Sequence, residues 1–268
     1  MGTLALRVTG ATLRYPLQPR PVLDGLDLEV AHGETFALVG SSGNGKSSLL
    51  RVIAGLERLD AGRIEVLDTP DPSSAERRFV GQPGMAFQEP LLLPWLTVTE
   101  NVSLGRRYRA NRRDGLPDVA DLLERLDLGP VRDSYPSELS GGQAQRASIA
   151  RAVAVRPSIL LLDEPFGALD PATRGDLRGW LRAVVREWRL TVVIVTHDLA
   201  EAIALGDRVG VLGRSGRIDQ TWTTADAGPS LASEILACFA HRAPATPAFP
   251  VETRSGSRAA WAGGQLAS

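Results

Sequence analysis

The chain contains a single lysine, and it lies in a glycine-rich run that could bind phosphate. Every other member of its 30 Lys and Arg residues is arginine, and lysine supplies a compact ammonium where a wide guanidinium would not fit. The run follows the phosphate-loop pattern G-x-x-x-x-G-K-S, between an apolar stretch at Phe36 to Val39 and helix-forming residues 48–55. Glycines let the backbone curl, so that its N–H groups and the start of the next helix can bind an anion.

This run predicts a site for the phosphates of a nucleotide. Lys46 would reach the β- and γ-phosphates, and the Ser47 hydroxyl would ligate Mg²⁺. The alternative is a glycine-rich turn with a solvated lysine, which the complete motif in a strand–loop–helix setting disfavours. The predicted nucleotide-binding residues of this run are Gly40, Ser41, Ser42, Gly43, Asn44, Gly45, Lys46, Ser47 and Ser48.

Two adjacent carboxylates follow a second apolar run. Ile159 to Leu162 is typical of a buried strand, and Asp163 and Glu164 come directly after it. In an open parallel sheet, ligands bind at the carboxyl ends of the strands. A phosphate-loop enzyme needs one carboxylate for Mg²⁺ and a group that orients the attacking water. Neighbouring residues on an extended segment point in different directions, so Asp163 and Glu164 can divide these roles. The alternative is a merely polar strand end.

A second glycine-rich turn precedes another helix-forming segment. Ser140, Gly141, Gly142 and Gln143 come before residues 144–155, which favour a helix throughout. A chain with two anion-binding helix starts can bind two nucleotides. It can also offer the second turn to a nucleotide held by another copy of itself.

The remaining pattern predicts an α/β protein with an inserted helical part. Alternation or apolar runs indicate strands at 22–30, 36–39, 63–67, 158–162 and 191–195, and strand–helix–strand order favours a parallel sheet. Helices are expected at 48–55, 119–128, 177–188 and 199–205. In the third, Trp180 and Trp188 fall on the apolar face and are expected in the core. Asp198 and Glu201 resemble a capping box at the start of the last.

Composition limits the classes of protein that fit. The chain has 268 residues, a formal net charge of -1 and one cysteine, Cys238. This charge gives no drive towards nucleic acid, and a lone cysteine cannot form an intramolecular disulfide. No apolar run approaches the ~18 residues of a membrane span, and residues 1–8 do not resemble a signal peptide. These features favour a cytosolic protein.

The turn at Ser140, continued by residues 144–152, resembles the signature motif of the ATP-binding cassette family. The resemblance covers about residues 4–240 and includes that family's other motifs in order. It implies a P-loop NTPase (RecA-like) core with an antiparallel β subdomain and an inserted α-helical subdomain. The ATPase domain would span 1–240, with its core at about 1–88 and 155–240 and the helical subdomain at about 89–154. Residues 241–268 are rich in Ala, Pro, Ser and Gly, and are expected to be a disordered tail.

The resemblance also implies roles for single residues. Tyr15 matches the aromatic residue that stacks on adenine, and Gln88 the glutamine that senses the γ-phosphate and contacts membrane subunits. Asp170 belongs to the segment that crosses a dimer interface, and His197 matches the histidine that orders the attacking water. Glu164, His197 and Gln88 are thus the expected catalytic residues. The expected Mg²⁺ ligands are Ser47, Gln88 and Asp163.

A narrower resemblance links residues 87–98 and 164–170 to the ATPase subunits of bacterial nitrate, sulfonate and taurine importers. Asn44 and Ala144 depart from that subfamily. The resemblance implies a head-to-tail homodimer with ATP between Lys46 of one chain and Ser140 of the other. It also implies separate permease subunits at the cytoplasmic face of the inner membrane and, indirectly, an extracytoplasmic solute-binding protein. Importers of pyrimidine precursors or bicarbonate share these segments and stay as alternatives.

Two other classes of protein differ from an importer subunit. A soluble cassette ATPase acting on DNA or ribosomes usually carries a coiled-coil insertion or two cassettes, and neither is present. A non-catalytic nucleotide scaffold is disfavoured by the intact Glu164 and His197. The basic cluster Arg106, Arg107, Arg109, Arg112 and Arg113 fits a solvated loop, with nucleic acid, anionic lipid or the permease as alternatives. No nucleic-acid partner is expected.

Overall fold

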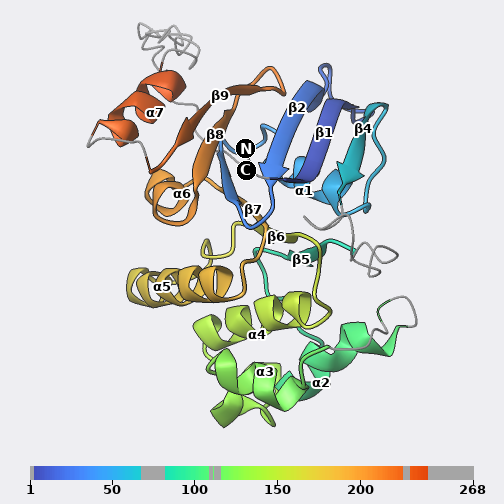
Figure 1. Cartoon of the computed structure of the whole chain (residues 1–268), viewed down its shortest axis with the longest axis vertical. Helices are drawn as coiled ribbons and strands as arrows, with labels where there is room; N and C mark the ends of the chain where they lie inside the picture. Colours follow the sequence, from blue (N-terminus) through green and yellow to red (C-terminus); the bar gives the residue numbers. More distant parts are fainter. Residues whose placement is uncertain (1–2, 68–81, 109–110, 112–115, 226–229, 241–268) are drawn as a thin grey trace, which may run out of the picture.

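The computed structural model describes residues 3–67, 82–108, 111, 116–225 and 230–240. Two sheets occupy the upper part of the molecule, and a group of helices lies below them (Figure 1). The predicted tail at 241–268 and Arg109, Arg112 and Arg113 of the basic cluster lie outside the described residues.

The larger sheet has six strands, and they include the strands that lead to the phosphate loop, Gln88, Asp163 and His197. Its order is β5 (Gly84–Ala86), β6 (Leu160–Asp163), β7 (Val192–Thr196), β3 (Thr35–Val39), β8 (Arg208–Leu212) and β9 (Ile218–Thr223). All neighbours pair in parallel except β8 and β9. Because β3, β6 and β7 are buried along their whole length, their apolar runs need no alternation. The predicted parallel sheet is present.

The smaller sheet is antiparallel, with the order β2 (Leu23–Ala31), β1 (Leu4–Leu13) and β4 (Ala61–Val66). In β2 the predicted alternation holds, because Leu26, Leu28 and Val30 are buried while Asp27 and Glu29 are exposed. One face of this sheet therefore packs on the phosphate-loop strand and α1 (Lys46–Ile53), in a core shared with Phe36, Leu38 and Leu49.

Helices cover the larger sheet and form the lower part of the molecule. The second half of the chain forms the helices α5 (Pro171–Glu187), α6 (Leu199–Leu205) and α7 (Leu231–Ala240). The inserted part contains α2 (Val98–Ser103), α3 (Val119–Arg125) and α4 (Gly141–Val153), with short 3₁₀ turns between them. Its buried residues share one core with the sheet, including Leu122, Ile149 and Leu162. No helix among the described residues is long and apolar enough to cross a membrane.

The expectation that Trp180 in α5 and Trp188, directly after it, lie in the core is wrong. Trp180 and Trp188 are half-buried and pack against the edge of the core, whereas Leu177, Leu181 and Val184 are buried. The Arg146 guanidinium lies over the Trp180 ring, 5.3 Å from its centroid, in a cation–π contact. Helical periodicity correctly selects the face but does not show how deep each side chain reaches.

Candidate nucleotide-binding site

The phosphate loop joins β3 to α1 and leaves the start of α1 open to an anion. The residue that precedes α1 is Gly45, which has no side chain to cap the helix, and the first turn of α1 carries no acidic residue. The free N–H groups and the positive end of the helix dipole therefore face the loop. The Asn44 side chain, one of the two departures from the subfamily, donates to the Leu212 carbonyl over 3.0 Å. This bond ties the loop to β8.

Gly45→Ala is expected to lower thermal stability and nucleotide affinity more than Gly43→Ala does. Both glycines have a positive φ, 94° and 83°, so each alanine costs about 1–2 kcal/mol of backbone strain. A Cβ on Gly45 would also clash with Val22 Cγ1, whereas a Cβ on Gly43 meets nothing within 4 Å. Thermal unfolding and ATP titration of the two variants would measure the difference. Equal losses would contradict a close-packing role for Gly45.

Lys46 is buried inside its own loop. Its side chain is 5% exposed, and its Nζ donates to the carbonyl oxygens of Gly40 at 2.8 Å and Ser41 at 3.3 Å. Nζ also lies 4.0 Å from the Glu164 carboxylate. Burial lowers the pKa of Lys46, and the nearby Glu164 and Asp163 charges oppose that shift. The ammonium is thus held at the loop by two carbonyl oxygens, whose place phosphate oxygens can take.

Ser47 and Asp163 form a pair of oxygen ligands suited to Mg²⁺. The Ser47 hydroxyl donates to Asp163 Oδ1 over 2.8 Å. Burial raises the pKa of Asp163, while this hydrogen bond opposes the rise. Across the described residues, no three His, Cys, Asp or Glu side chains gather closely enough to hold a metal ion. Two protein oxygens fit Mg²⁺ all the same, because Mg²⁺ usually takes its other ligands from substrate phosphates and water.

Asp163→Asn is expected to stabilise the protein without Mg²⁺ and to weaken its binding of Mg²⁺ and ATP. A carboxyl whose folded-state pKa is raised contributes stability below its unfolded pKa and loses it as pH rises through the folded pKa. The variant keeps an oxygen acceptor for Ser47 and avoids that loss, so its melting temperature should exceed the parent's at neutral pH. Mg²⁺-dependent ATP affinity should fall at least about tenfold, or ~1.4 kcal/mol. Thermal unfolding against pH, with and without MgATP, measures both. A variant that melts below the parent at every pH would contradict this assignment.

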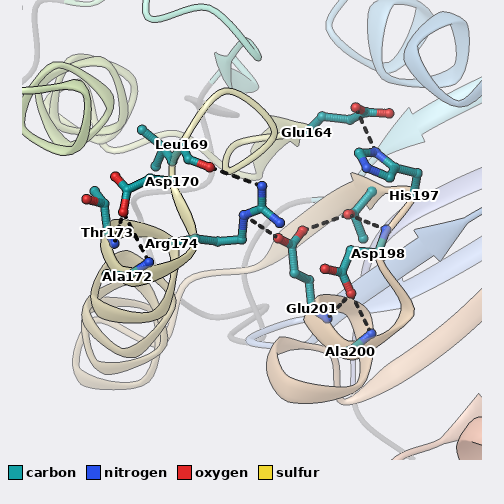
Figure 2. Close-up of polar contacts among 11 residues, drawn as sticks. Glu164, Leu169, Asp170, Ala172, Thr173, Arg174, His197, Asp198, Ala200 and Glu201 are labelled. Carbon is teal, nitrogen blue, oxygen red and sulfur yellow. Dashed lines mark hydrogen bonds and ion pairs between the residues drawn. The ribbon is translucent and has the colours of Figure 1, made fainter.

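Glu164, the residue after Asp163, meets His197. Its Oε2 lies 3.1 Å from His197 Nδ1, at the end of the next strand, β7 (Figure 2). Glu164 has a φ of 44°, which is uncommon for a residue with a side chain. Its backbone N–H donates to the Val195 carbonyl over 2.9 Å, which fixes this turn against β7. The His197 side chain is 58% exposed, whereas that of Glu164 is 18% exposed.

Gln88 lies beside this pair, on the loop after β5. A Cβ on Gly167 would sit 3.1 Å from the Gln88 amide nitrogen and 3.6 Å from Glu164 Oε2, so both side chains flank Gly167. Helix α4 holds the loop, because the Gln145 side chain donates to the Phe87 carbonyl over 3.1 Å. Arg151 donates to the carbonyls of Leu91 and Pro90 as well.

Tyr15 lies near the start of α1, and its hydroxyl is already engaged. The hydroxyl donates to Glu57 Oε2 over 2.7 Å and lies 3.0 Å from the Ser48 hydroxyl. Burial is the main cause of the raised pKa of Tyr15. These contacts place the ring beside the phosphate loop. Stacking of the ring on adenine stays a prediction.

The second glycine-rich turn is not brought to the phosphate loop within one chain. Ser140 caps α4 through a reciprocal capping box with Gln143, and both Ser140 and Gly141 are exposed. Helix α4 lies in the lower part of the molecule, whereas α1 lies in the upper part (Figure 1). Gly141 and Gly142 instead adjoin Leu169 and Thr173 at the start of α5, and the exposed Asp170 caps that helix. The turn and Asp170 therefore present a free surface.

The sequence analysis did not predict the contacts of three polar residues behind His197, namely Thr196, Arg174 and Glu201. The predicted capping box of Asp198 and Glu201 is wrong in one half. Asp198 does cap α6, but its own N–H donates to the Thr196 hydroxyl, so Glu201 binds Thr196 instead. A threonine directly before His197 was the available signal, because its hydroxyl competes for the capping N–H.

Comparison with known proteins identifies the family of the chain. The family model described as "ABC transporter" matches residues 23–167. The sulfate/thiosulfate import ATP-binding protein CysA of Rhodopseudomonas palustris is 43% identical over 87% of this chain and 67% of its own length. The Nitrosomonas europaea CysA is 46% identical over 75% and 56%. The chain thus spans roughly three fifths of the length of several curated relatives, such as 60% of a Xylella fastidiosa CysA.

Among solved structures, the dimeric ATP-binding cassette MJ0796 bound to ADP and Pi matches with a TM-score of 0.66. It is 30% identical over 82% of this chain and 98% of its own. The fold and the site thus define a P-loop ATPase cassette, and the predicted fold class is confirmed. The chain belongs to the ABC transporter family. ATP and Mg²⁺, the predicted cofactors, are confirmed at the level of this family. The relatives named above are sulfate/thiosulfate proteins, so the nitrate, sulfonate and taurine type is not established.

Proposed function

We propose that this chain is the ATP-binding and ATP-hydrolysing subunit of a bacterial ABC importer. One observation carries the proposal. Lys46, the Ser47–Asp163 pair and the Glu164–His197 pair converge at the carboxyl ends of three adjacent strands, β3, β6 and β7. That edge of a parallel sheet is where ligands bind.

In this proposal the phosphate loop and Lys46 hold the β- and γ-phosphates of ATP. Ser47 and Asp163, with Gln88, hold Mg²⁺, which neutralises charge that develops on the phosphates. Tyr15 holds the adenine. The lowered pKa of Lys46 comes mainly from burial, and phosphate oxygens in the same place would favour its charged form.

Glu164 and His197 are the proposed catalytic pair. Glu164 would accept a proton from the attacking water or orient it, and His197 would fix the position of that carboxylate. The 3.1 Å contact supports this division, and so does the exposure of His197 towards solvent. Gln88 beside Gly167 would close the third side of the water site.

A second copy of the chain would complete each site. Ser140, Gly141, Gly142 and Gln143 would contact the nucleotide held by Lys46 of the partner, and Asp170 would lie in the interface between the copies. The exposure of Ser140, Gly141 and Asp170 supports this arrangement, and the similar MJ0796 cassette is described as dimeric.

The transported solute is proposed to be a small anion such as an aliphatic sulfonate, taurine or nitrate. The curated relatives are sulfate/thiosulfate import proteins, and sulfonate, taurine and nitrate present similar anionic oxygens. Pyrimidine precursors and bicarbonate stay as alternatives. A solute-binding protein encoded nearby, titrated with each anion, would identify the solute. Stimulation of ATP hydrolysis in the assembled complex by the loaded binding protein would support the import function. ATP hydrolysis that is stimulated only by DNA or by ribosomes would refute it.

Permease subunits would bind beside Gln88 and hold the chain at the cytoplasmic face of the membrane. Leu91 and Trp95, on the loop that α4 holds, are 53% and 68% exposed. Apolar side chains gathered next to a site are typical of a protein-binding surface. The lack of an excess of basic residues supports the expectation that nucleic acid is not a partner.

Trp95→Glu is expected to abolish co-purification with the permease and to leave the ATP affinity of the isolated chain within about twofold. Burying a charge at the centre of an apolar interface lowers the binding affinity, because the charge loses its hydration. Leu236→Glu is the matched control, since Leu236 is 56% exposed on the distant helix α7. If both variants bind the permease as the parent does, the docking surface lies elsewhere.

A further inference from the structure

A polar network behind His197 joins two segments of the site that are far apart in sequence (Figure 2). At its centre is Glu201, whose side chain is only 4% exposed. The Thr196 hydroxyl donates to Glu201 Oε2 over 2.7 Å, and the Arg174 guanidinium lies against Glu201 Oε1. A buried carboxylate is costly unless it is paired in this way.

On one side, the network fixes the two residues that flank His197. The Asp198 N–H donates to the Thr196 hydroxyl over 3.0 Å, and Asp198 in turn caps α6 by accepting from Ala200 and Glu201. His197 itself points out of this frame towards Glu164. The position of its ring therefore depends on Thr196 and Asp198.

On the other side, the network reaches the segment that would cross the dimer interface. Arg174 Nη2 donates to the Leu169 carbonyl over 3.1 Å, one residue before Asp170. The same guanidinium is paired with Glu201, with Nε 3.8 Å from Oε1. Arg174 is thus a single side chain that contacts both the interface segment and the frame of His197.

The Arg174 contact with Glu201 is an ion pair that stops short of a hydrogen bond. Its Nε is buried and has no hydrogen-bond partner. A charge-assisted hydrogen bond would need a separation of about 2.8 Å. Shortening the separation between Arg174 Nε and Glu201 Oε1 by about 1 Å would therefore add a bond that this arrangement lacks. Because the same guanidinium donates to the Leu169 carbonyl, a partner chain that shifts the segment 169–170 would also change this separation.

We propose that Arg174 and Glu201 are positioning residues, which set the place of His197 according to whether a second copy of the chain contacts the segment 168–170. This inference rests on the proposed function, because it concerns the hydrolytic step at the same site. Neither residue touches the reacting atoms. Their effect would pass through Thr196 and Asp198 to the His197 ring.

The first test compares Arg174→Met with Arg182→Met, an exposed arginine two turns further along α5. Arg174→Met should lower kcat for ATP about tenfold with little change in KM, because nucleotide binding does not use the network. Arg174→Lys keeps a cation near Glu201 and should recover part of the loss. Arg182→Met should remain within about twofold of the parent.

The decisive measurement repeats Arg174→Met in a His197→Ala background. If Arg174 acts through His197, its replacement should produce no further loss of kcat once the imidazole is absent. A full additional tenfold loss in that background would overturn the proposal. So would a parent-like kcat in Arg174→Met alone, or a loss that Arg182→Met reproduces.

Separate controls distinguish a loss of folding from a loss of catalysis. The melting temperature of each variant shows whether a lower kcat reflects a smaller folded fraction, and Glu201→Gln, which retains an oxygen acceptor for Thr196, supplies a milder second variant. A parent chain that does not hydrolyse ATP would refute the proposed function itself. An active parent with additive Arg174 and His197 effects would refute only the positioning role.

Discussion

Glu164→Gln is expected to lower ATP turnover by roughly 10²- to 10⁴-fold, the range for loss of a general base. Glutamine has the size of Glu164 and can still meet His197, but it cannot accept a proton from water. ATP should therefore bind and bring two chains together, with hydrolysis too slow to separate them. Size-exclusion chromatography with light scattering should show an ATP-dependent dimer, and single-turnover kinetics should show the loss in the chemical step.

Glu187→Gln provides the control for this variant. Glu187 is an exposed residue near the end of α5, with a side chain that is 63% exposed. The Glu187→Gln variant should hydrolyse ATP at the parent rate and form no persistent dimer. Hydrolysis at the parent rate by Glu164→Gln would contradict the catalytic role of Glu164.

Lys46→Met is expected to weaken ATP binding at least about 100-fold, equivalent to ~2.7 kcal/mol. Lys46 is the only lysine of the chain, and its ammonium group lies inside the phosphate loop. Methionine fills a similar volume without the charge. Lys46→Arg should bind poorly too, because its wide planar fork does not fit between the Gly40 and Ser41 carbonyls. Titration with a fluorescent nucleotide measures both.

The stability of Lys46→Met separates lost binding from misfolding. A lysine whose folded-state pKa is lowered by burial is charged at a cost to folding at neutral pH. Removing that charge should leave the melting temperature without nucleotide equal to or above the parent's. Weak binding together with a lower melting temperature would indicate damage to the loop and would not support a direct phosphate contact. Parent-like binding would contradict the site.

Much of this site was predictable because it depends on local sequence. The ends of β3 and β6 follow from apolar runs, and a parallel sheet brings such ends to one edge, which placed Ser47 beside Asp163. Two carboxylates at the end of β6 were predictable, but Glu164 turns towards His197 through a left-handed backbone with a φ of 44°, which strand alternation does not predict. The glycine-rich turn at Ser140 was also predictable. No local pattern, however, shows whether it contacts a nucleotide of its own chain or of another copy.

What escaped prediction depends on tertiary contacts. Glu201 has the spacing of a capping partner, but Thr196 already holds the Asp198 N–H, and the carboxylate turns inward to Thr196 and Arg174. Arg174 comes from another helix, so its role is fixed only when α5 and α6 lie together. The half-burial of Trp180 depends in the same way on Arg146 from α4.

The central claim is that each nucleotide site takes Lys46 from one chain and Ser140 from another, and mixing two defective chains tests it most directly. Both chains carry Glu164→Gln, one adds Lys46→Met and the other adds Ser140→Arg. Each alone lacks an intact site and should remain monomeric with ATP. A mixed pair has one intact site, formed by Lys46 of the second chain and Ser140 of the first. The mixture should therefore form an ATP-dependent dimer with half the bound nucleotide of the Glu164→Gln dimer. A mixture that stays monomeric, while the Glu164→Gln parent dimerises, would contradict the shared site.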